Sequence, residues 1–174
     1  MIDFCVLGSG VAGSTIANLL SKKYSVHVFD KARGAGGRSS NKKLKGNLSF
    51  DHGVQYISPK SKVFTKITQK LFKKKILKIW DGNHLDFTFE KKTLTPKYIG
   101  VKANNALSKY YLKNIKTFFS SQIVKIENKK YFWEITLDNS SKHQFKALIL
   151  TCPFPQLKKL AGRYLEKKVS NLKI

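Results

Sequence analysis

The chain has 174 residues, of which 41% are hydrophobic and 12% aromatic, a composition that allows one folded domain with a core and excludes wholesale disorder. Its longest apolar stretches fall far short of the roughly 20 residues that a membrane-spanning helix needs. The formal charge of +24 raises the alternative of a basic protein that binds nucleic acid, but the excess is nearly all lysine, is spread over every segment and accompanies no recognition motif.

The N-terminal part predicts a strand, a helix and a second strand. Residues 2–7 form an apolar run that glycine ends, as in a strand buried on both faces of a parallel sheet. Apolar residues recur at helical spacing through 11–20, and the apolar and β-branched residues of 26–29 predict the next strand. This unit of about thirty residues has the length that a parallel crossover needs.

The middle of the chain predicts an inserted lobe. Residues 63–72 place apolar side chains on one face of a helix and lysines on the other. Residues 76–80, an Asp81-Gly82-Asn83 turn and the alternating apolar residues of 85–89 predict a β-hairpin.

Beyond residue 100 the pattern returns to a sheet that proline ends at Pro153 and Pro155. The expected elements are a helix around 107–111, a strand at 118–124, a hairpin or meander through 131–137 and 143–145, and a buried strand at 147–150.

The cysteines and the first residues indicate the compartment. Asp3 lies inside the first apolar run and no basic leader precedes it, which argues against a secretory signal. Cys5 and Cys152 each lie in an apolar run, and their spacing fits neither a disulfide framework nor a zinc site. We therefore expect a cytoplasmic protein with two core thiols, no metal, no membrane and no nucleic acid as partner.

Gly8-Ser9-Gly10-Val11-Ala12-Gly13 is a GxGxxG motif between the first strand and the first helix. Its glycines permit a tight turn, a close approach of the backbone to a pyrophosphate, and close packing of helix on strand. Asp30 follows Gly8 by roughly 20 positions and would accept hydrogen bonds from an adenosine ribose. An acid at this position favours a free 2′-hydroxyl, so the motif predicts FAD or NAD rather than NADP.

A second glycine-rich loop directly follows Asp30. It reads Lys31-Ala32-Arg33-Gly34-Ala35-Gly36-Gly37-Arg38, and a plain NAD-binding unit has no need of it. Gly36 and Gly37 would bring backbone amides close to phosphate, and Arg38 could bind its oxygens bidentately. The loop resembles the Arg-x-x-Gly-Gly-Arg signature of the flavin amine oxidase superfamily, in which it lies along the FAD diphosphate and ribose.

Downstream segments are similar to renalase-like members of that superfamily in order and spacing. The run Asp51-His52-Gly53-Val54-Gln55-Tyr56 resembles the segment that brings glycine backbone near the flavin ring, which implies roles for Gly53 and Gln55. The stretches 80–82, 96–100 and 148–156 extend the likeness, which implies that Val124 pairs with the adenine and Thr151 lies near the nucleotide.

Two departures from the family pattern stand out. Residues 101–105 replace the Pro-Gly-Met-like turn that usually follows the Tyr-x-Gly stretch, and family members continue well beyond Ile174. Asp51 and His52 are neighbours on a strand and point to opposite faces, so no catalytic acid or base is assigned.

The resemblance implies an α/β fold: a Rossmann-like FAD-binding domain of the two-dinucleotide-binding type with an inserted α+β substrate lobe, truncated at its C-terminus. The expected divisions are 1–57, the first part of the FAD-binding domain; 58–100, the inserted segment of the substrate lobe; 101–155, the FAD-binding domain continued; and 156–174, the start of a truncated second lobe segment. The expected cofactor-binding residues are Gly8, Ser9, Gly10, Val11, Ala12, Gly13, Asp30, Lys31, Arg33, Gly37, Arg38, Gly53, Gln55, Val124 and Thr151.

The resemblance also implies a function. It is that of a FAD-dependent oxidoreductase, which transfers a hydride from a small reduced substrate, a dihydronicotinamide or an amine, to the flavin, with O2 as the acceptor. The alternatives are a truncated or split FAD-binding fragment that is inactive alone and needs a second chain, an NAD-binding reductase, and a basic nucleic-acid-binding protein.

Overall fold

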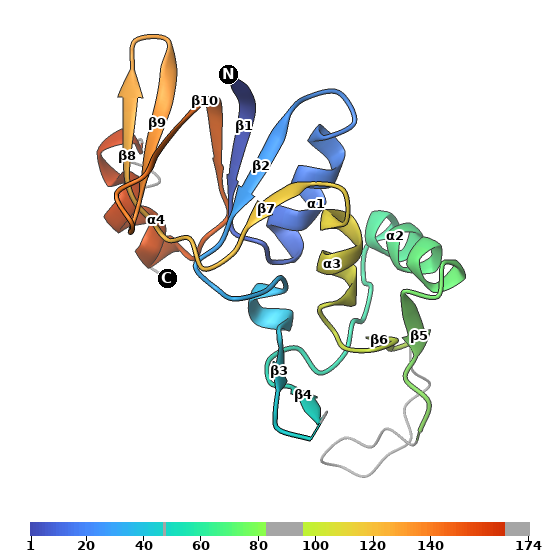
Figure 1. Ribbon diagram of the computed structural model, residues 1–174. Coiled ribbons are helices and arrows are strands. Elements are labelled where there is room, and N and C mark those ends of the chain that lie inside the picture. Colours follow the sequence, from blue (N-terminus) through green and yellow to red (C-terminus); the bar gives the residue numbers. More distant parts are fainter. Residues whose placement is uncertain (47, 83–95, 166–174) are drawn as a thin grey trace.

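A six-stranded sheet forms the centre of the computed structural model, which describes residues 1–46, 48–82 and 96–165 (Figure 1). The strands lie in the order β7-β2-β1-β10-β9-β8. Their bounds are Ile2–Leu7 for β1, Val26–Phe29 for β2, Lys116–Phe118 for β7, Ile123–Lys129 for β8, Phe132–Leu137 for β9 and Lys142–Leu150 for β10. Strands β7, β2, β1 and β10 pair in parallel, whereas β10, β9 and β8 form an antiparallel meander.

The parallel strands are buried on both faces, because successive side chains of a strand point to opposite sides. Val6 and Val28 pack on one face against α1 (Val11–Leu20) and the end of α3 (Ala106–Leu112). Cys5 and Phe29 pack on the other face with the β8–β9 meander and α4 (Phe154–Ala161). Figure 1 shows α1 and α3 side by side next to the sheet. The sheet thus carries two separate core clusters.

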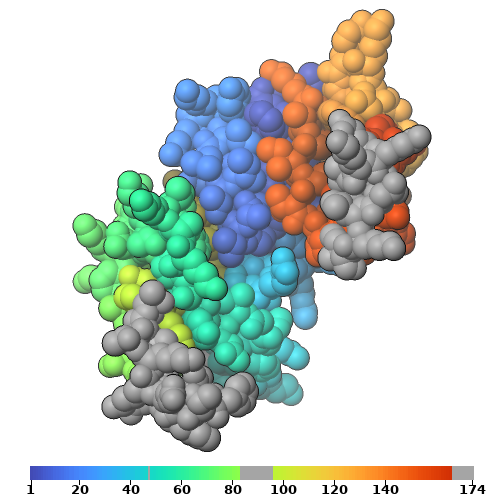
Figure 2. Space-filling model, turned by 180° about the vertical axis from the view of Figure 1, so that it is seen from behind, coloured from blue at the N-terminus to red at the C-terminus, as the bar shows by residue number. Residues whose placement is uncertain are grey.

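A smaller lobe extends from the sheet domain. Helix α2 (Lys62–Lys73) packs on a two-stranded antiparallel sheet of β5 (Leu77–Ile79) and β6 (Tyr98–Gly100). Figure 2 shows α2 (green) as part of a body beside the blue and orange residues of the large sheet. The core of this lobe consists of Leu71, Leu77, Tyr98 and Leu107, the last contributed by α3. Helix α3 therefore joins the lobe to the sheet domain.

The remaining elements are short. Strands β3 and β4 form an antiparallel hairpin, and the two 3-10 helices are single turns. Their bounds are Asn41–Lys43 for β3, Ser49–Asp51 for β4, Gly37–Ser39 for η1 and Gly162–Tyr164 for η2.

The predicted α/β, Rossmann-like fold is confirmed, and so are the N-terminal strand-helix-strand unit and the helices at 63–72 and 107–111. Two local predictions are wrong. Residues 118–124 are not one strand, because Ser120 adopts φ 50° between β7 and β8. The segments 143–145 and 147–150 belong to the single strand β10, which pairs with β9 through its first part and with β1 through its second.

The predicted hairpin of residues 76–80 with 85–89 stays a prediction. Strand β5 pairs with β6, which lies beyond residue 95, while the expected partner at 85–89 lies outside the described residues. The expectation of two core thiols holds for Cys5 alone, because Cys152 is only half-buried after the end of β10.

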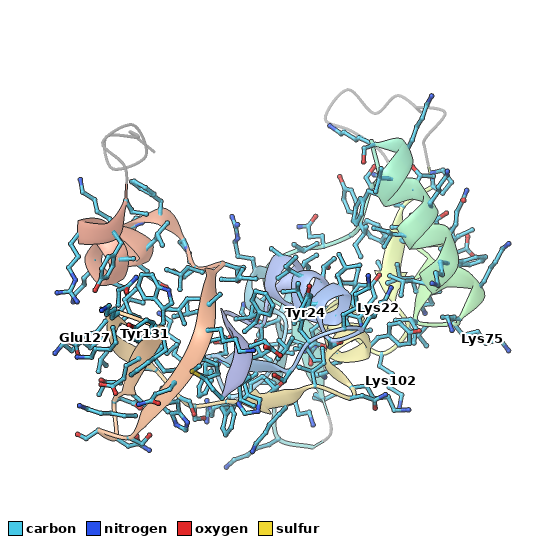
Figure 3. All side chains as sticks on the ribbon, turned by 90° about the horizontal axis from the view of Figure 1, so that it is seen from above. Lys22, Tyr24, Lys75, Lys102, Glu127 and Tyr131 are labelled. Carbon is cyan, nitrogen blue, oxygen red and sulfur yellow. The ribbon has the colours of Figure 1, made fainter. Side chains whose placement is uncertain are left out.

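The lysines are distributed over the surface. Lys22, Lys75 and Lys102 are exposed and follow α1, α2 and β6 respectively, as Figure 3 shows. Glu127 and Tyr131, on the β8–β9 meander, lie at the opposite end of that view from α2. Within the described ranges, no helix combines the length and the apolar character needed to cross a membrane.

Candidate dinucleotide-binding site

A cleft of about 1330 Å³ opens where β1, β2 and β10 end. Strand β1 lies between β2 and β10, so the loops that leave these strands diverge and open a crevice at the carboxyl edge of the sheet. Eleven of the expected cofactor-binding residues line this cleft, namely Gly8, Gly10, Val11, Ala12, Gly13, Asp30, Lys31, Gly37, Arg38, Val124 and Thr151. Residues from four distant segments of the chain therefore meet at one site.

The turn between β1 and α1 requires glycine at two positions. Gly8 has φ +106°, which residues with a side chain rarely adopt. A Cβ atom on Gly13 would lie 1.9 Å from the carbonyl oxygen of Gly8, so only glycine lets the helix pack this close to the turn. Gly10 caps α1 without a side-chain hydrogen bond, and the first turn holds no acidic residue. The amide groups at this helix end are thus available to an anion.

Asp30, at the end of β2, is held in a fixed orientation. Its Oδ2 accepts hydrogen bonds from the backbone N–H of Ser9 (2.7 Å) and from the Ser9 hydroxyl (2.5 Å), and its Oδ1 accepts one from the N–H of Ala32 (2.8 Å). A carboxylate has about four acceptor positions, so one remains for a ribose hydroxyl. Ser9 itself is fully buried and does not line the cleft, so its side chain positions Asp30.

The second glycine-rich loop lies directly against the first. Gly10 and Gly36 form a parallel bridge, and the N–H of Gly36 donates to the carbonyl oxygen of Ser9 (3.0 Å). Gly36 and Gly37 have φ of 133° and 54°, which explains why glycine stands at both positions. Arg38 is exposed at the cleft, and its guanidinium has no hydrogen-bond or ion-pair partner among the residues that the structure describes.

Thr151 connects the end of β10 to the glycine turn. Its hydroxyl donates to the carbonyl oxygen of Leu7 (2.8 Å) and lies 2.6 Å from where a Cβ on Gly8 would be. Cys152 follows at the cleft wall, and burial raises the pKa of its thiol, while a backbone hydrogen bond and then the charge of Lys31 act in the opposite direction. This thiol is therefore protonated at neutral pH rather than a ready nucleophile.

Four expected residues lie outside the lining. Ser9 is buried and donates hydrogen bonds to Asp30, and Arg33 is exposed on the loop before Gly34. Gly53 lies against the loop instead, because a Cβ on it would be 2.0 Å from the carbonyl oxygen of Arg38. The carbonyl oxygen of Gln55 accepts a hydrogen bond from Asn104.

Sequence reasoning missed an apolar extension of the cleft. It is formed by one face of α1 together with side chains of α2 and α3. These three helices are far apart in sequence, and each of them has an ordinary amphipathic pattern. No local motif marks them as a group. These residues are Thr15, Ile16, Leu19, Phe64, Ile67, Leu107 and Tyr111.

The residues present fit FAD. The cleft is larger than the roughly 300–1,000 Å³ of usual small-ligand pockets, as a dinucleotide requires. Free helix amides suit a diphosphate, as does Arg38, which has no partner among the described residues. Asp30 suits a ribose, and residues 121–124 with Phe29 offer a surface for an aromatic base. Among the described residues, no three His, Cys, Asp or Glu gather as metal ligands would.

Fold and cleft together define a dinucleotide-binding chain of the Rossmann-like class. The NAD(P)-binding Rossmann-like domain family matches residues 6–71. A triple mutant of putrescine oxidase, from a redesign of its cofactor binding, superposes with a TM-score of 0.74 at 10% identity, covering 98% of this chain and 62% of that one. The tetracycline destructase Tet(51) superposes with a TM-score of 0.64 at 12% identity, covering 97% and 42%. At such identities these structures show the fold.

A curated protein resembles this chain in sequence. Renalase of Mus musculus is 28% identical over 170 residues, which cover 90% of this chain and 48% of that protein. The chain therefore spans about half the length of this relative. The expected likeness to a renalase-like protein is confirmed, and the Rossmann-like domain fits FAD.

Proposed function

We propose that this chain is the FAD-binding part of an oxidoreductase of the renalase or amine-oxidase type. The observation that carries the proposal is that a single cleft joins the glycine turn, the carboxylate of Asp30 and the loop that ends at Arg38. In the finer form of the proposal, a small reduced substrate, a dihydronicotinamide or an amine, gives up a hydride and O2 is the final acceptor.

Each part of the cleft has a proposed role in binding. The amides at the start of α1 and the Arg38 guanidinium bind the diphosphate, and Asp30 accepts a ribose hydroxyl. Val124 faces the adenine, while Gly53 and Gln55 belong to the flavin side. FAD, when bound, supplies the redox chemistry, and the protein contributes binding and orientation. The full proposed set is Gly8, Ser9, Gly10, Val11, Ala12, Gly13, Asp30, Lys31, Arg33, Gly37, Arg38, Gly53, Gln55, Val124 and Thr151.

The domain division is part of the same proposal. The two-stranded β5–β6 sheet with α2 has its own core cluster, which supports a substrate-lobe segment at 58–100 between two parts of the FAD-binding domain. The apolar extension of the cleft lies between this lobe and α1, where a small substrate could lie out of water.

A second candidate is a FAD-binding segment that needs further polypeptide for turnover. It is supported by the share of renalase that the chain matches, 48%. On this hypothesis FAD binds but no substrate reduces it until a second chain completes the substrate side.

The test begins with the visible spectrum of the purified chain and identification of the flavin released on denaturation. We expect FAD near one per chain, loss of its colour on anaerobic addition of a dihydronicotinamide isomer or an amine, and peroxide on admission of O2. Stable colour with every reductant supports the second candidate. A chain that takes up no added FAD, or that binds NAD instead, contradicts both.

Variants assign the binding to the cleft. Arg38→Ala removes a charge-assisted contact to phosphate, worth about 1.5–3 kcal/mol, so FAD affinity should fall at least tenfold. Lys130→Ala removes an equal charge from the turn between β8 and β9, where the Lys130 side chain contacts the Tyr131 ring. This variant should leave FAD affinity unchanged. Equal losses in both variants would show a nonspecific effect of charge.

A further inference from the structure

Asn104 connects three backbone segments between the lobe and the cleft. Its side chain is buried, with 3% exposure, and its amide nitrogen donates to the carbonyl oxygens of Val54 (2.7 Å) and Gln55 (3.0 Å). Its side-chain oxygen accepts a hydrogen bond from the N–H of Gly100 (2.9 Å), at the end of β6. Both amide hydrogens and the oxygen are therefore used, and the orientation of the amide group is unambiguous.

The segment that Asn104 holds is itself attached to the cofactor loop. The N–H of Val54 donates to the carbonyl oxygen of Arg38 (3.0 Å), and the neighbouring Gly53 has no room for a Cβ against the same carbonyl. The backbone N–H of Asn104 also donates to both carboxylate oxygens of Asp51 (3.1 Å each). A displacement of residues 51–55 would therefore move the backbone of Arg38.

Asn105 holds the other side of the same loop. Its side-chain nitrogen donates to the carbonyl oxygen of Ala35 (3.1 Å), and its Cβ lies 2.8 Å from where a Cβ on Gly36 would be. Asn105 thus contacts one end of the loop from Ala35 to Arg38 directly, and Asn104 is linked to its other end through Val54, although neither asparagine lines the cleft. They lie in the 101–105 segment that departs from the family's Pro-Gly-Met-like turn, and a methionine could not make these hydrogen bonds.

We propose that Asn104 is a positioning residue for the cofactor site, which fixes the backbone of Arg38 through residues 51–55, with Asn105 in support. The inference rests on the proposed function. It predicts that an amide is required: an aspartate at 104 keeps the size and the acceptor for Gly100 but loses both donors, and it places a carboxylate against two carbonyl oxygens and Asp51.

The experiment compares Asn104→Asp with the matched variant Asn18→Asp. The Asn18 side chain likewise donates to a backbone carbonyl of another element, that of Tyr111 (3.1 Å), but lies outside the cleft. FAD dissociation constants and the visible spectrum of the bound flavin are measured together with the melting temperature. We expect Asn104→Asp to weaken FAD binding about tenfold or more and to alter the spectrum, whereas Asn18→Asp lowers only the melting temperature.

A second readout needs no FAD. In the FAD-free protein the amide of Val54 should exchange its hydrogen about tenfold faster in Asn104→Asp than in the wild type or in Asn18→Asp, because Val54 and Gln55 lose the hydrogen bonds that hold them beside Arg38. If Asn104→Asp does not fold, Asn105→Asp, which removes only the bond to Ala35, gives the same comparison at the FAD site.

The outcomes separate the two ideas. A wild type that binds FAD, with unchanged affinity and spectrum in Asn104→Asp, overturns the inference. A wild type that binds no FAD overturns the proposed function instead, and the exchange rate of Val54 then decides whether Asn104 holds this loop at all. If the exchange rate of Val54 is the same in Asn104→Asp and in the wild type, the positioning role of Asn104 is overturned even when no FAD binds.

Discussion

The sheet domain and the lobe differ in how their structure is secured. The sheet is buried on both faces by two clusters, and its strands include side chains without any exposure, such as Cys5, Val6 and Phe29. Within the described residues, the lobe has one cluster of four buried side chains, one of which comes from α3, and a pair of three-residue strands. Isolated two-stranded sheets are marginal in water, so the paired strands β5 and β6 depend on their contacts with α2 and α3.

This difference has a consequence for the cleft. The wall built from the ends of β1, β2 and β10 belongs to the sheet domain with its two core clusters, whereas the wall formed by Phe64 and Ile67 belongs to the lobe with its smaller cluster. Low-stability segments are the ones that open and close around ligands. We therefore expect the dinucleotide side to be preformed and the lobe side to respond to what binds there.

The largest effect should come from Gly13→Ala. The added Cβ would lie 1.9 Å from a backbone oxygen of Gly8, and neither the strand end nor the helix can move away without disturbing the sheet. We expect a loss of about 3 kcal/mol or more in the free energy of unfolding, with loss of FAD binding. Chemical denaturation and flavin titration measure both.

Gly34→Ala is the control for this change. No atom lies within 4 Å of the Cβ position of Gly34, on the neighbouring loop. Its stability should stay near that of the wild type. If Gly13→Ala were as stable as Gly34→Ala, the turn would not be rigid and the contrast with the lobe would disappear.

Leu71→Ala should produce the next largest effect, confined to the lobe. Leu71 is 1% exposed in the lobe cluster, and such truncations cost about 2–5 kcal/mol. Hydrogen exchange should accelerate at β5 amides and remain slow at β1 amides. Val63→Ala, at a position that is 71% exposed on the same helix, should change neither. Equal acceleration in both sheets would mean that lobe and sheet domain unfold as one unit.

Ser9→Ala should have a smaller effect, on the preformed wall. The hydroxyl of Ser9 is buried and hydrogen-bonded to Asp30, and bonds to charged groups contribute about 1.5–3 kcal/mol. Because Asp30 would then be less well oriented, FAD affinity should fall as well. Ser14→Ala, equally buried but bonded to a carbonyl within its own helix, should leave FAD affinity unchanged. Isothermal titration of both variants with FAD makes the comparison.

The smallest effect should come from Asp3→Asn at the opposite edge of the sheet. Lys146 and then Ser25 hold the pKa of the Asp3 carboxyl well below its ordinary value of 3.8. Because the carboxyl has a lower pKa in the folded than in the unfolded state, it stabilises the fold at pH values above the ordinary pKa. This contribution is lost as the pH falls through the folded-state pKa. Urea unfolding should therefore separate variant and wild type at pH 7 and bring them closer together at pH 3.

A second variant tests the cause. Lys146→Met removes the cation that contributes most to the shift. It should reproduce the loss at pH 7, whereas a difference between wild type and Asp3→Asn that is the same at pH 7 and pH 3 would contradict the assigned cause.

The sequence predicted the site best where the signals are local. The GxGxxG turn, Asp30 and the Gly36-Gly37-Arg38 loop lie within one short stretch, and their spacing alone indicates a strand, a helix and a dinucleotide. The pairing of β5 with β6, the division of 118–124 between two strands and the continuity of β10 could not be found in this way. Each depends on which strand lies alongside, and short apolar runs fit several partners equally well.

The sequence by itself therefore determined the class of fold, the nucleotide-binding turn and its carboxylate, because these depend on residues close together in the chain and on backbone angles that glycine allows. Only the tertiary structure decided that Ser9 orients Asp30, that Thr151 supports the glycine turn and that Asn104 secures the loop of Arg38. These roles are hydrogen bonds between distant segments, and a side chain's type does not reveal which carbonyl or carboxylate the fold will bring within its reach.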